Sequence, residues 1–291
     1  MKETMISPLA YVDPSAKIGK NVTVHPFAYI DKNVEIGDDN VIMPYASLMS
    51  GTRMGNGNKV YQGAVVAAVP QDFAYTGEDT LAYIGNNNVI GPHVIIGCPA
   101  TDTKHTNCIH EDPRVIIGNN NIIREFSLIE QPCYEEKTIV GNDVFLMQGV
   151  HISHDVCLQD KVVITNTSVL AGIVKVLEGA NIAMACTINQ YTVIGQYSIV
   201  ATNAACMKNV KPFSRYIPGK PLSVNYYAIK KFGFEAYEKE IKVLGFEDLK
   251  DGLELDMIGL KGSPTNVYQS FTKEVKGAGT ILEGLSADEA V

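Results

Sequence analysis

The sequence predicts a mainly β fold, a parallel β-helix of hexapeptide repeats wound into a triangular prism, followed by a small α-helical domain. An aliphatic residue returns at every sixth position over most of the chain up to Cys206. Gly, Asp or Asn often follows it, as in "IGKNVT" and "IGNNNV". A period of six fits neither the 3.6-residue period of a helix nor the simple alternation of a strand.

In a hexapeptide β-helix, each flat side of the prism contributes one inward aliphatic residue, and turn formers such as Asn and Gly occupy the corners. The repeat positions are Val12, Ile18, Val24, Ile30, Ile36, Ile42, Leu48, Met54, Val60 and Val66; Ile84, Ile90 and Ile96; Ile117, Ile123 and Ile129; and Val140, Leu146, Ile152, Leu158, Ile164, Leu170, Val176, Ile182, Ile188, Ile194, Val200 and Cys206. Three sides make a coil of about 18 residues, which predicts about nine coils. Residues 18 apart should therefore lie directly above one another, one strand spacing apart.

The repeat is interrupted three times, at residues 67–83, 97–115 and 130–139. Long excursions from a regular solenoid are usually where binding surfaces are built. We therefore expect the functional site near these three segments.

After Cys206 the repeat stops, which divides the chain into a β-helix domain, residues 1–217, and a helical domain, residues 218–291. The stretches "KPLSVNYYAIKKFG" and "EAYEKEIKVLG" predict short helices that end at glycine. A further helix is expected around Asn266–Lys276.

Composition narrows the class of protein. The 291 residues carry a net charge of −8, which argues against a nucleic-acid-binding protein. The N-terminal stretch lacks the apolar core of a signal peptide, and no apolar run approaches the length of a membrane span. The six cysteines form no CxxC pair, so we expect reduced thiols in a cytoplasmic protein.

The stretch "GVHISHDVCL", residues 149–158, holds two histidines and an aspartate among apolar residues. Counting by 18 places His154, Gly172 and Gln190 in one column. His154 near a corner is suited to be a general base, because imidazole accepts a proton at neutral pH. Asp155 or a backbone carbonyl would hold its tautomer, and the amide of Gly172 would stabilise an oxyanion. The alternative is that His151 and His154 are ordinary surface histidines.

No Ser or Cys is placed convincingly as a nucleophile in this stretch. Direct attack of an alcohol on an activated acyl donor is therefore the simplest chemistry for such a column. An imidazole base contributes typically about 10²–10⁴ in rate, and an oxyanion donor about 10²–10³.

The motifs "VYQGAVVAAVPQDFAYTGE", "HISHD", "NTSVLAG", "NQYTVIG" and "VNYYAIKKFGF" resemble the hexapeptide acyltransferases. The resemblance is closest to the acyl-carrier-protein-dependent UDP-N-acetylglucosamine O-acyltransferases of lipid A synthesis. It implies left-handed coils and a homotrimer with active sites at subunit boundaries. It also implies acyl carrier protein and a UDP-amino sugar as partners. No metal or cofactor is implied beyond the phosphopantetheine that carries the acyl donor.

The resemblance also assigns roles. The family's base falls on His154 and its oxyanion donor on Gly172. The residues that contact the donor or the nucleotide sugar fall on His151, Gln190 and Asn225.

An Asp-x-Lys element of the family has two counterparts here. The second excursion contains Asp102 and Lys104 at nearly the family's distance from the histidines, and we favour this pair. The first excursion contains Asp72 within "PQDFAYTGE", which matches the family's sequence better, but Ala74 stands in place of the lysine.

One further position matches the family's pattern, and several depart from it. Lys231 corresponds to a basic position that contacts the donor or nucleotide. Thr202 stands where a glycine often helps to set acyl-chain length, and a larger side chain there would suit a shorter chain. Glu130 and Gln131 replace a basic pair, and Ile173 replaces a histidine.

The segment 161–234 is basic in an acidic protein. Its only acid is Glu178, against Lys161, Lys175, Lys208, Lys211, Arg215, Lys220, Lys230 and Lys231. Such a run is often only a solvated face, but it would also steer an acidic carrier protein or a nucleotide diphosphate.

Three other functions stay open at this level. One is a UDP-amino-sugar N-acyl- or acetyltransferase that uses acyl-CoA. A second is a zinc protein like the γ-carbonic anhydrases, with His105 or His110 as a third ligand beside His151 and His154. A third is a catalytically silent scaffold.

Overall fold

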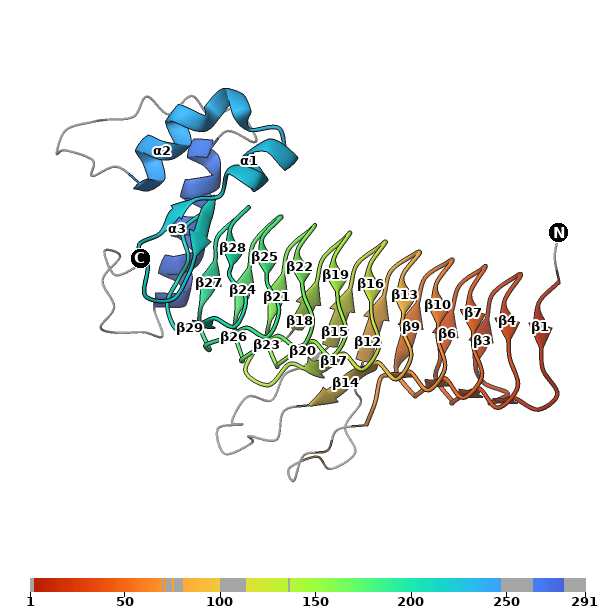
Figure 1. Ribbon diagram of the computed structural model, residues 1–291. Coiled ribbons are helices and arrows are strands. Elements are labelled where there is room, and N and C mark those ends of the chain that lie inside the picture. The colour runs from red at the N-terminus through yellow and green to blue at the C-terminus, as the bar shows by residue number, and fades with distance from the viewer. Residues whose placement is uncertain are drawn as a thin grey trace.

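The protein is described by a computed structural model covering residues 3–69, 71, 75, 81–99, 114–135, 137–246 and 264–279. Three sheets of short strands form the three sides of a long prism (Figure 1). All strand pairs are parallel except β30 with β31, which closes the C-terminal end. The fold is the expected left-handed parallel β-helix.

From β1 to β29, successive strands of the chain belong to sheets A, B and C in turn. Sheet A contains β1 (Met5–Ile6), β4 (Thr23–Val24), β7 (Val41–Ile42), β10 (Lys59–Val60), β13 (Val89–Ile90), β16 (Ile122–Ile123), β19 (Phe145–Leu146), β22 (Val163–Ile164), β25 (Asn181–Ile182), β28 (Ile199–Val200), β30 (Ser214–Tyr216) and β31 (Ser223–Val224). Sheet B contains β2 (Tyr11–Val12), β5 (Tyr29–Ile30), β8 (Ser47–Leu48), β11 (Val65–Val66), β14 (Ile95–Pro99), β17 (Leu128–Gln131), β20 (His151–Ile152), β23 (Val169–Leu170), β26 (Thr187–Ile188) and β29 (Ala205–Cys206). Sheet C contains β3 (Lys17–Ile18), β6 (Glu35–Ile36), β9 (Thr52–Met54), β12 (Leu81–Ile84), β15 (Arg114–Ile117), β18 (Lys137–Val140), β21 (Cys157–Leu158), β24 (Lys175–Val176) and β27 (Val193–Ile194).

The predicted vertical register is confirmed. Ile152 pairs with Leu170 one coil further on, and Leu170 pairs with Ile188. Sheet B contains 10 strands and sheet C 9, in agreement with the expected number of coils. Strand β1 adds one strand before the first predicted repeat position.

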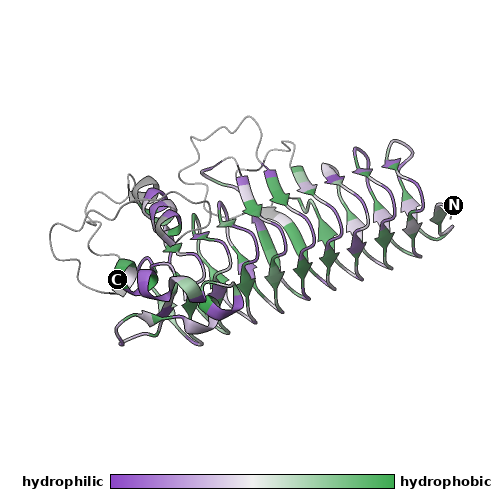
Figure 2. Ribbon diagram, turned by 90° about the horizontal axis from the view of Figure 1, so that it is seen from above, coloured by the Kyte–Doolittle hydropathy of each residue, from purple (hydrophilic) through white to green (hydrophobic). Residues whose placement is uncertain are grey.

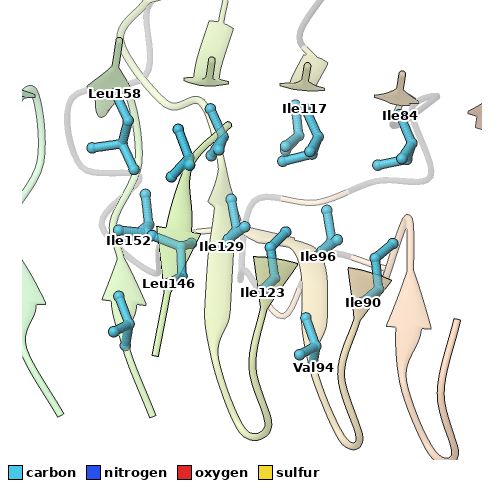
Figure 3. Packing of buried hydrophobic residues seen from close by; sticks show 14 of the residues in the cluster. Ile84, Ile90, Val94, Ile96, Ile117, Ile123, Ile129, Leu146, Ile152 and Leu158 are labelled. Atoms are coloured by element: carbon cyan, nitrogen blue, oxygen red, sulfur yellow. The ribbon is translucent and has the colours of Figure 1, made fainter. Parts of the chain in front are cut away.

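The predicted aliphatic positions form the core. From Val24 to Cys206 they are all buried, and most are completely inaccessible to solvent. Figure 3 shows Ile96, Ile129 and Ile152 stacked from coil to coil inside the prism. In Figure 2 the strands are mainly hydrophobic and the connecting turns mainly hydrophilic. Burial of one apolar residue per side in every coil therefore stabilises the whole rod.

The corners differ from expectation in one respect. Positive φ angles occur at Asn33 and Gly57, as predicted, but also at bulky residues such as Phe27, Tyr45 and Ile173. A backbone bond to the preceding coil holds this conformation, since the Ile173 amide donates to the His154 carbonyl at 3.1 Å. Stacking between coils thus overrides the usual preference for glycine at such positions.

All three predicted excursions leave the prism at the same corner. Paired positions are 18 residues apart in regular coils but 30, 33 and 23 apart across the first, second and third excursions. Each excursion connects a strand of sheet B with the next strand of sheet C, after β11, β14 and β17. We call this edge the B–C corner, and name the A–B and C–A corners in the same way.

The predicted helices are confirmed as α1 (Tyr226–Lys231), the 3₁₀ helix η2 (Glu235–Tyr237), α2 (Glu238–Phe246) and α3 (Pro264–Gly279). An aromatic cluster that includes Tyr197 and Phe213 packs α1 on the C–A corner near the C-terminal end of the prism. Helix α3 packs on sheet C through Phe271, and Glu274 forms an ion pair with Lys175 at 2.9 Å. None of the helices in the described part of the chain is both long and apolar enough to span a membrane.

Candidate active site

The two histidines of the "HISHD" motif lie where β20 runs into the B–C corner. Ile152 is buried in the core, which turns His151 and Ser153 outward. His154 follows at the corner, where its side chain is 19% exposed, and Asp155 takes the positive φ of the turn. The candidate site is therefore at the corner from which the excursions leave.

Asp155 fixes the tautomer of His154. Its Oδ2 lies 2.7 Å from Nδ1 of the imidazole. A carboxylate only accepts hydrogen bonds, so Nδ1 carries the hydrogen and Nε2 is left with its lone pair. This arrangement is the one that a general base requires.

The third excursion holds Asp155 in place. The carboxylate is completely buried and accepts backbone hydrogen bonds from Cys133, Tyr134 and Glu135 at 2.9–3.0 Å. The Asp155 amide donates to the hydroxyl of Thr138 at 2.9 Å. A buried carboxylate with this many donors needs no cation beside it.

Gly172 lies one coil beyond His154 and under its ring. A Cβ atom on Gly172 would be 2.2 Å from Cε1 and 2.4 Å from Nε2 of His154, so only glycine leaves room for the imidazole. Within the described residues, the Gly172 amide donates no hydrogen bond. The structure thus brings a free imidazole nitrogen and a free backbone donor to one place.

Glu130, at the end of β17, contacts both histidines. Its Oε1 lies 2.8 Å from Nε2 of His151, and its Oε2 accepts from the backbone amide of His154 at 3.1 Å. In the sequence, Glu130 is recognisable only as a departure from the family's pattern, where a basic residue is usual. The ring of Tyr134 tilts against the His154 ring at a centroid distance of 5.4 Å.

Of the other predicted site residues, Gln190 lies at the same corner as His154, and Thr202, Asn225 and Lys231 lie at other corners. Gln190 is exposed and follows Ile188, in the column that contains His154 and Gly172. Thr202 is exposed but lies at the A–B corner, between β28 and β29. Asn225 and Lys231 belong to the α1 region at the C–A corner.

Asn225 is buried, and its side-chain hydrogen bonds stabilise the start of α1. Its Oδ1 accepts from the Ala228 amide as the N-cap of α1, and its Nδ2 donates to the Tyr197 carbonyl at 2.9 Å. Its contact with substrate remains a prediction. Lys231 is exposed, with its ammonium 5.1 Å from the centre of the Phe232 ring.

Asp72, Asp102 and Lys104 lie outside the described residues, and so do His105 and His110. Among the residues that are described, no group of three or more His, Cys, Asp or Glu side chains is placed to hold a metal ion. Burial raises the pKa of the Cys157 and Cys186 thiols and raises that of Cys206 to about 11, so these three remain protonated thiols at neutral pH.

Comparisons with known proteins show the family of the chain. Residues 33–68 match the family described as bacterial transferase hexapeptide (six repeats). The chain is 34% identical over 258 residues to an acyl-[acyl-carrier-protein]–UDP-N-acetylglucosamine O-acyltransferase of Janthinobacterium sp. (strain Marseille), covering 87% of this chain and 86% of that protein. The chain belongs to this acyltransferase family. A member from Herminiimonas arsenicoxydans is 32% identical over 235 residues, covering 80% of this chain and 78% of the relative.

The family resemblance extends to three dimensions. The crystal structure of a UDP-N-acetylglucosamine acyltransferase from Bacteroides fragilis superimposes with a TM-score of 0.62 and 28% sequence identity. The match covers 98% of this chain and 94% of that one, so the helical end is included with the prism.

Proposed function

We propose that the protein transfers a fatty acyl group from the thioester of acyl carrier protein to a hydroxyl of UDP-N-acetylglucosamine, an early step of lipid A synthesis. Membership of the family supports the reaction class and the two substrates. The observation that carries the proposal is the His154 imidazole, which Asp155 orients and which leaves Nε2 free beside the Gly172 amide.

The proposed reaction needs one base and one oxyanion donor. The sugar hydroxyl gives its proton to Nε2 of His154 while its oxygen attacks the thioester carbonyl. The carbonyl oxygen becomes an oxyanion that accepts a hydrogen bond from the Gly172 amide. Collapse of this intermediate forms the ester and expels the carrier's thiolate, which takes the proton back from the imidazolium. Asp155 stabilises that imidazolium while it exists.

We further propose a homotrimer in which each site is shared between two subunits. Thr202 lies at the A–B corner and Lys231 near the C–A corner, whereas His154 lies at the B–C corner. Figure 1 shows α1 and β20 on opposite edges of the prism. Residues on these separate corners meet only if the corner of one copy lies against a neighbouring copy.

The A–B corner has the surface that such an interface requires. Leu9, Phe27, Tyr45 and Phe126 are 51–63% exposed along this edge. The Phe27 and Tyr45 rings stack at 5.2 Å, and His93 stacks on Phe126 at 5.3 Å. A row of exposed aromatic side chains on one edge is typical of a surface that a partner covers, and we propose that the partner is a second copy of this chain.

The test is a donor screen by mass spectrometry. UDP-N-acetylglucosamine is incubated with carrier-protein thioesters of graded chain length, and in parallel an amine-bearing sugar nucleotide is incubated with acetyl-CoA. Ester formation from the first pair supports the proposal, and turnover of only the second pair would replace it with N-acyl transfer. His154→Ala should lose about 10²-fold or more in activity, while His151→Ala retains more. Equal losses would contradict the assigned roles.

A further inference from the structure

The carboxylate of Glu130 bridges both histidines of the site from the preceding coil. Ile129 pairs with Ile152, so the residue that follows Ile129 enters the B–C corner one coil before the "HISHD" turn, on the side opposite Gly172. The Glu130 side chain is only 13% exposed. One of its oxygens receives the His151 ring and the other receives the His154 backbone amide, at 2.8 and 3.1 Å.

This contact gives His151 a defined tautomer. Because the carboxylate is only an acceptor, Nε2 of His151 carries the hydrogen. The other nitrogen, Nδ1, then bears a lone pair, and it has no hydrogen-bond partner among the described residues. The His151 side chain is 35% exposed, so a ligand can approach the ring from solvent. His151 thus holds the tautomer opposite to that of His154.

The charge of the pair restricts what it binds. A neutral imidazole with a carboxylate behind it carries one negative charge, and even a protonated imidazole only brings the pair to zero. Such a group is poorly suited to hold a phosphate. An exposed acceptor nitrogen instead matches the O–H of a sugar or the N–H of an amide.

We propose that Glu130 is a positioning residue with two effects, and the proposal rests on the function proposed above. It orients His151 so that Nδ1 accepts a hydrogen bond from a neutral hydroxyl or amide of a substrate. It also anchors the backbone of His154, and so fixes the height of the base above Gly172.

Glu130→Gln separates the two effects. The backbone amide of His154 is only a donor, so it will donate to the oxygen of the new carboxamide in this variant. The carboxamide nitrogen must then face Nε2 of His151 and donate to it. His151 is thereby forced into the other tautomer, with the hydrogen on Nδ1. The anchor of His154 is retained, while the acceptor offered to the substrate becomes a donor.

The first measurement is the tautomer of His151 in the free, full-length protein, read from the side-chain ¹⁵N shifts of ¹⁵N-histidine-labelled protein and assigned with His151→Ala. We expect the Nε2–H form in the wild type and the Nδ1–H form in Glu130→Gln. An unchanged tautomer in this variant overturns the proposal. This readout involves no substrate, so it stands or fails independently of the acyl transfer proposed above.

The second measurement is steady-state kinetics with each substrate varied in turn. Glu130→Gln should raise KM for one substrate about 10-fold, the loss of one hydrogen bond, and leave kcat within about threefold. Glu130→Ala should also lower kcat, because the His154 amide loses its acceptor. Unchanged KM values for both substrates in Glu130→Gln overturn the proposal.

Two controls separate positioning from general damage. Glu35→Gln removes an acid that pairs with Lys17 near the N-terminal end of sheet C, and it should change neither readout. In the background of His151→Ala, Glu130→Gln should raise KM no further, because it acts through that ring. If the effects of the two substitutions multiply, the proposal is contradicted. Thermal unfolding of every variant checks that a change in KM does not come from a loss of folded protein.

Discussion

Gly172→Ala is the most direct test of the stacked site, because the substitution is small and its consequence is geometric. The new methyl group would lie 2.2 Å from Cε1 and 2.4 Å from Nε2 of His154. Carbon atoms in contact are normally about 3.5–4.0 Å apart. The imidazole must therefore move by about 1 Å or more. The backbone at Gly172 does not have a positive φ, so alanine itself is not strained there.

The movement affects the base and not the prism. Displacing the ring stretches its 2.7 Å bond to Asp155 and carries Nε2 away from the substrate position. A misplacement of about 1 Å in a catalytic group costs on the order of 10²-fold in rate. We therefore expect kcat to fall about 10²-fold, equivalent to about 2.7 kcal/mol of activation free energy.

The assay is kcat at saturating concentrations of both substrates, with thermal unfolding measured on the same samples. The matched control is the double variant with His154→Ala, in which the alanine at position 172 has no ring to displace. In that background Gly172→Ala should have almost no further effect on activity or stability. If Gly172→Ala alone kept kcat within about threefold of wild type, His154 would not be the base in the position described here.

Three further predictions concern the buried groups. Asp155→Asn places an amide group against the backbone donors of residues 133–135. Urea titration should then show a free energy of unfolding lower by about 1–3 kcal/mol, and kcat should be at least about 10²-fold lower. An unchanged free energy of unfolding would contradict this. Burial raises the pKa of Tyr197 to about 12, above the 10.0 of an exposed tyrosine. The unfolded chain therefore releases this proton first, and Tm should fall as pH rises from about 10 to 12. In Tyr197→Phe, Tm should fall less over the same pH range. An equal fall in Tm would show that the ionisation of Tyr197 is not the cause. Cys206, with its pKa raised to about 11, should resist alkylation at pH 8 until urea is added; rapid reaction of the folded protein would contradict the burial.

The stacking of His154 over Gly172 could be predicted from the sequence because nothing interrupts the repeat between Val140 and Cys206. Each coil there contains 18 residues, as the pairing of Ile152 with Leu170 shows. Counting therefore placed these residues correctly. The same counting separates Thr202 from them, since 202 is 12 residues beyond 190 and thus belongs to another corner.

Glu130 could not be found by counting. Across the third excursion, paired residues are 23 apart instead of 18, so the usual addition leads to the wrong partner. The hydrogen bonds that hold Asp155 come from the backbone of residues 133–135, and backbone donors leave no signature in the choice of amino acid. The supporting contacts therefore depend on the path of an irregular segment, which the repeat does not determine.

The location of this segment follows from the prism itself. A residue inserted within a strand would shift every later side chain from the core to the surface, whereas an insertion between two sides leaves the register intact. Such an insertion adds chain at one corner only, next to the turns of the neighbouring coils. The third excursion lies one coil before the His154 turn, so its amides reach Asp155, and Glu130, in the strand that leads into it, reaches both histidines. A short irregular segment in the neighbouring coil thus supplies hydrogen-bonding groups to side chains that the repeat has already aligned in one column.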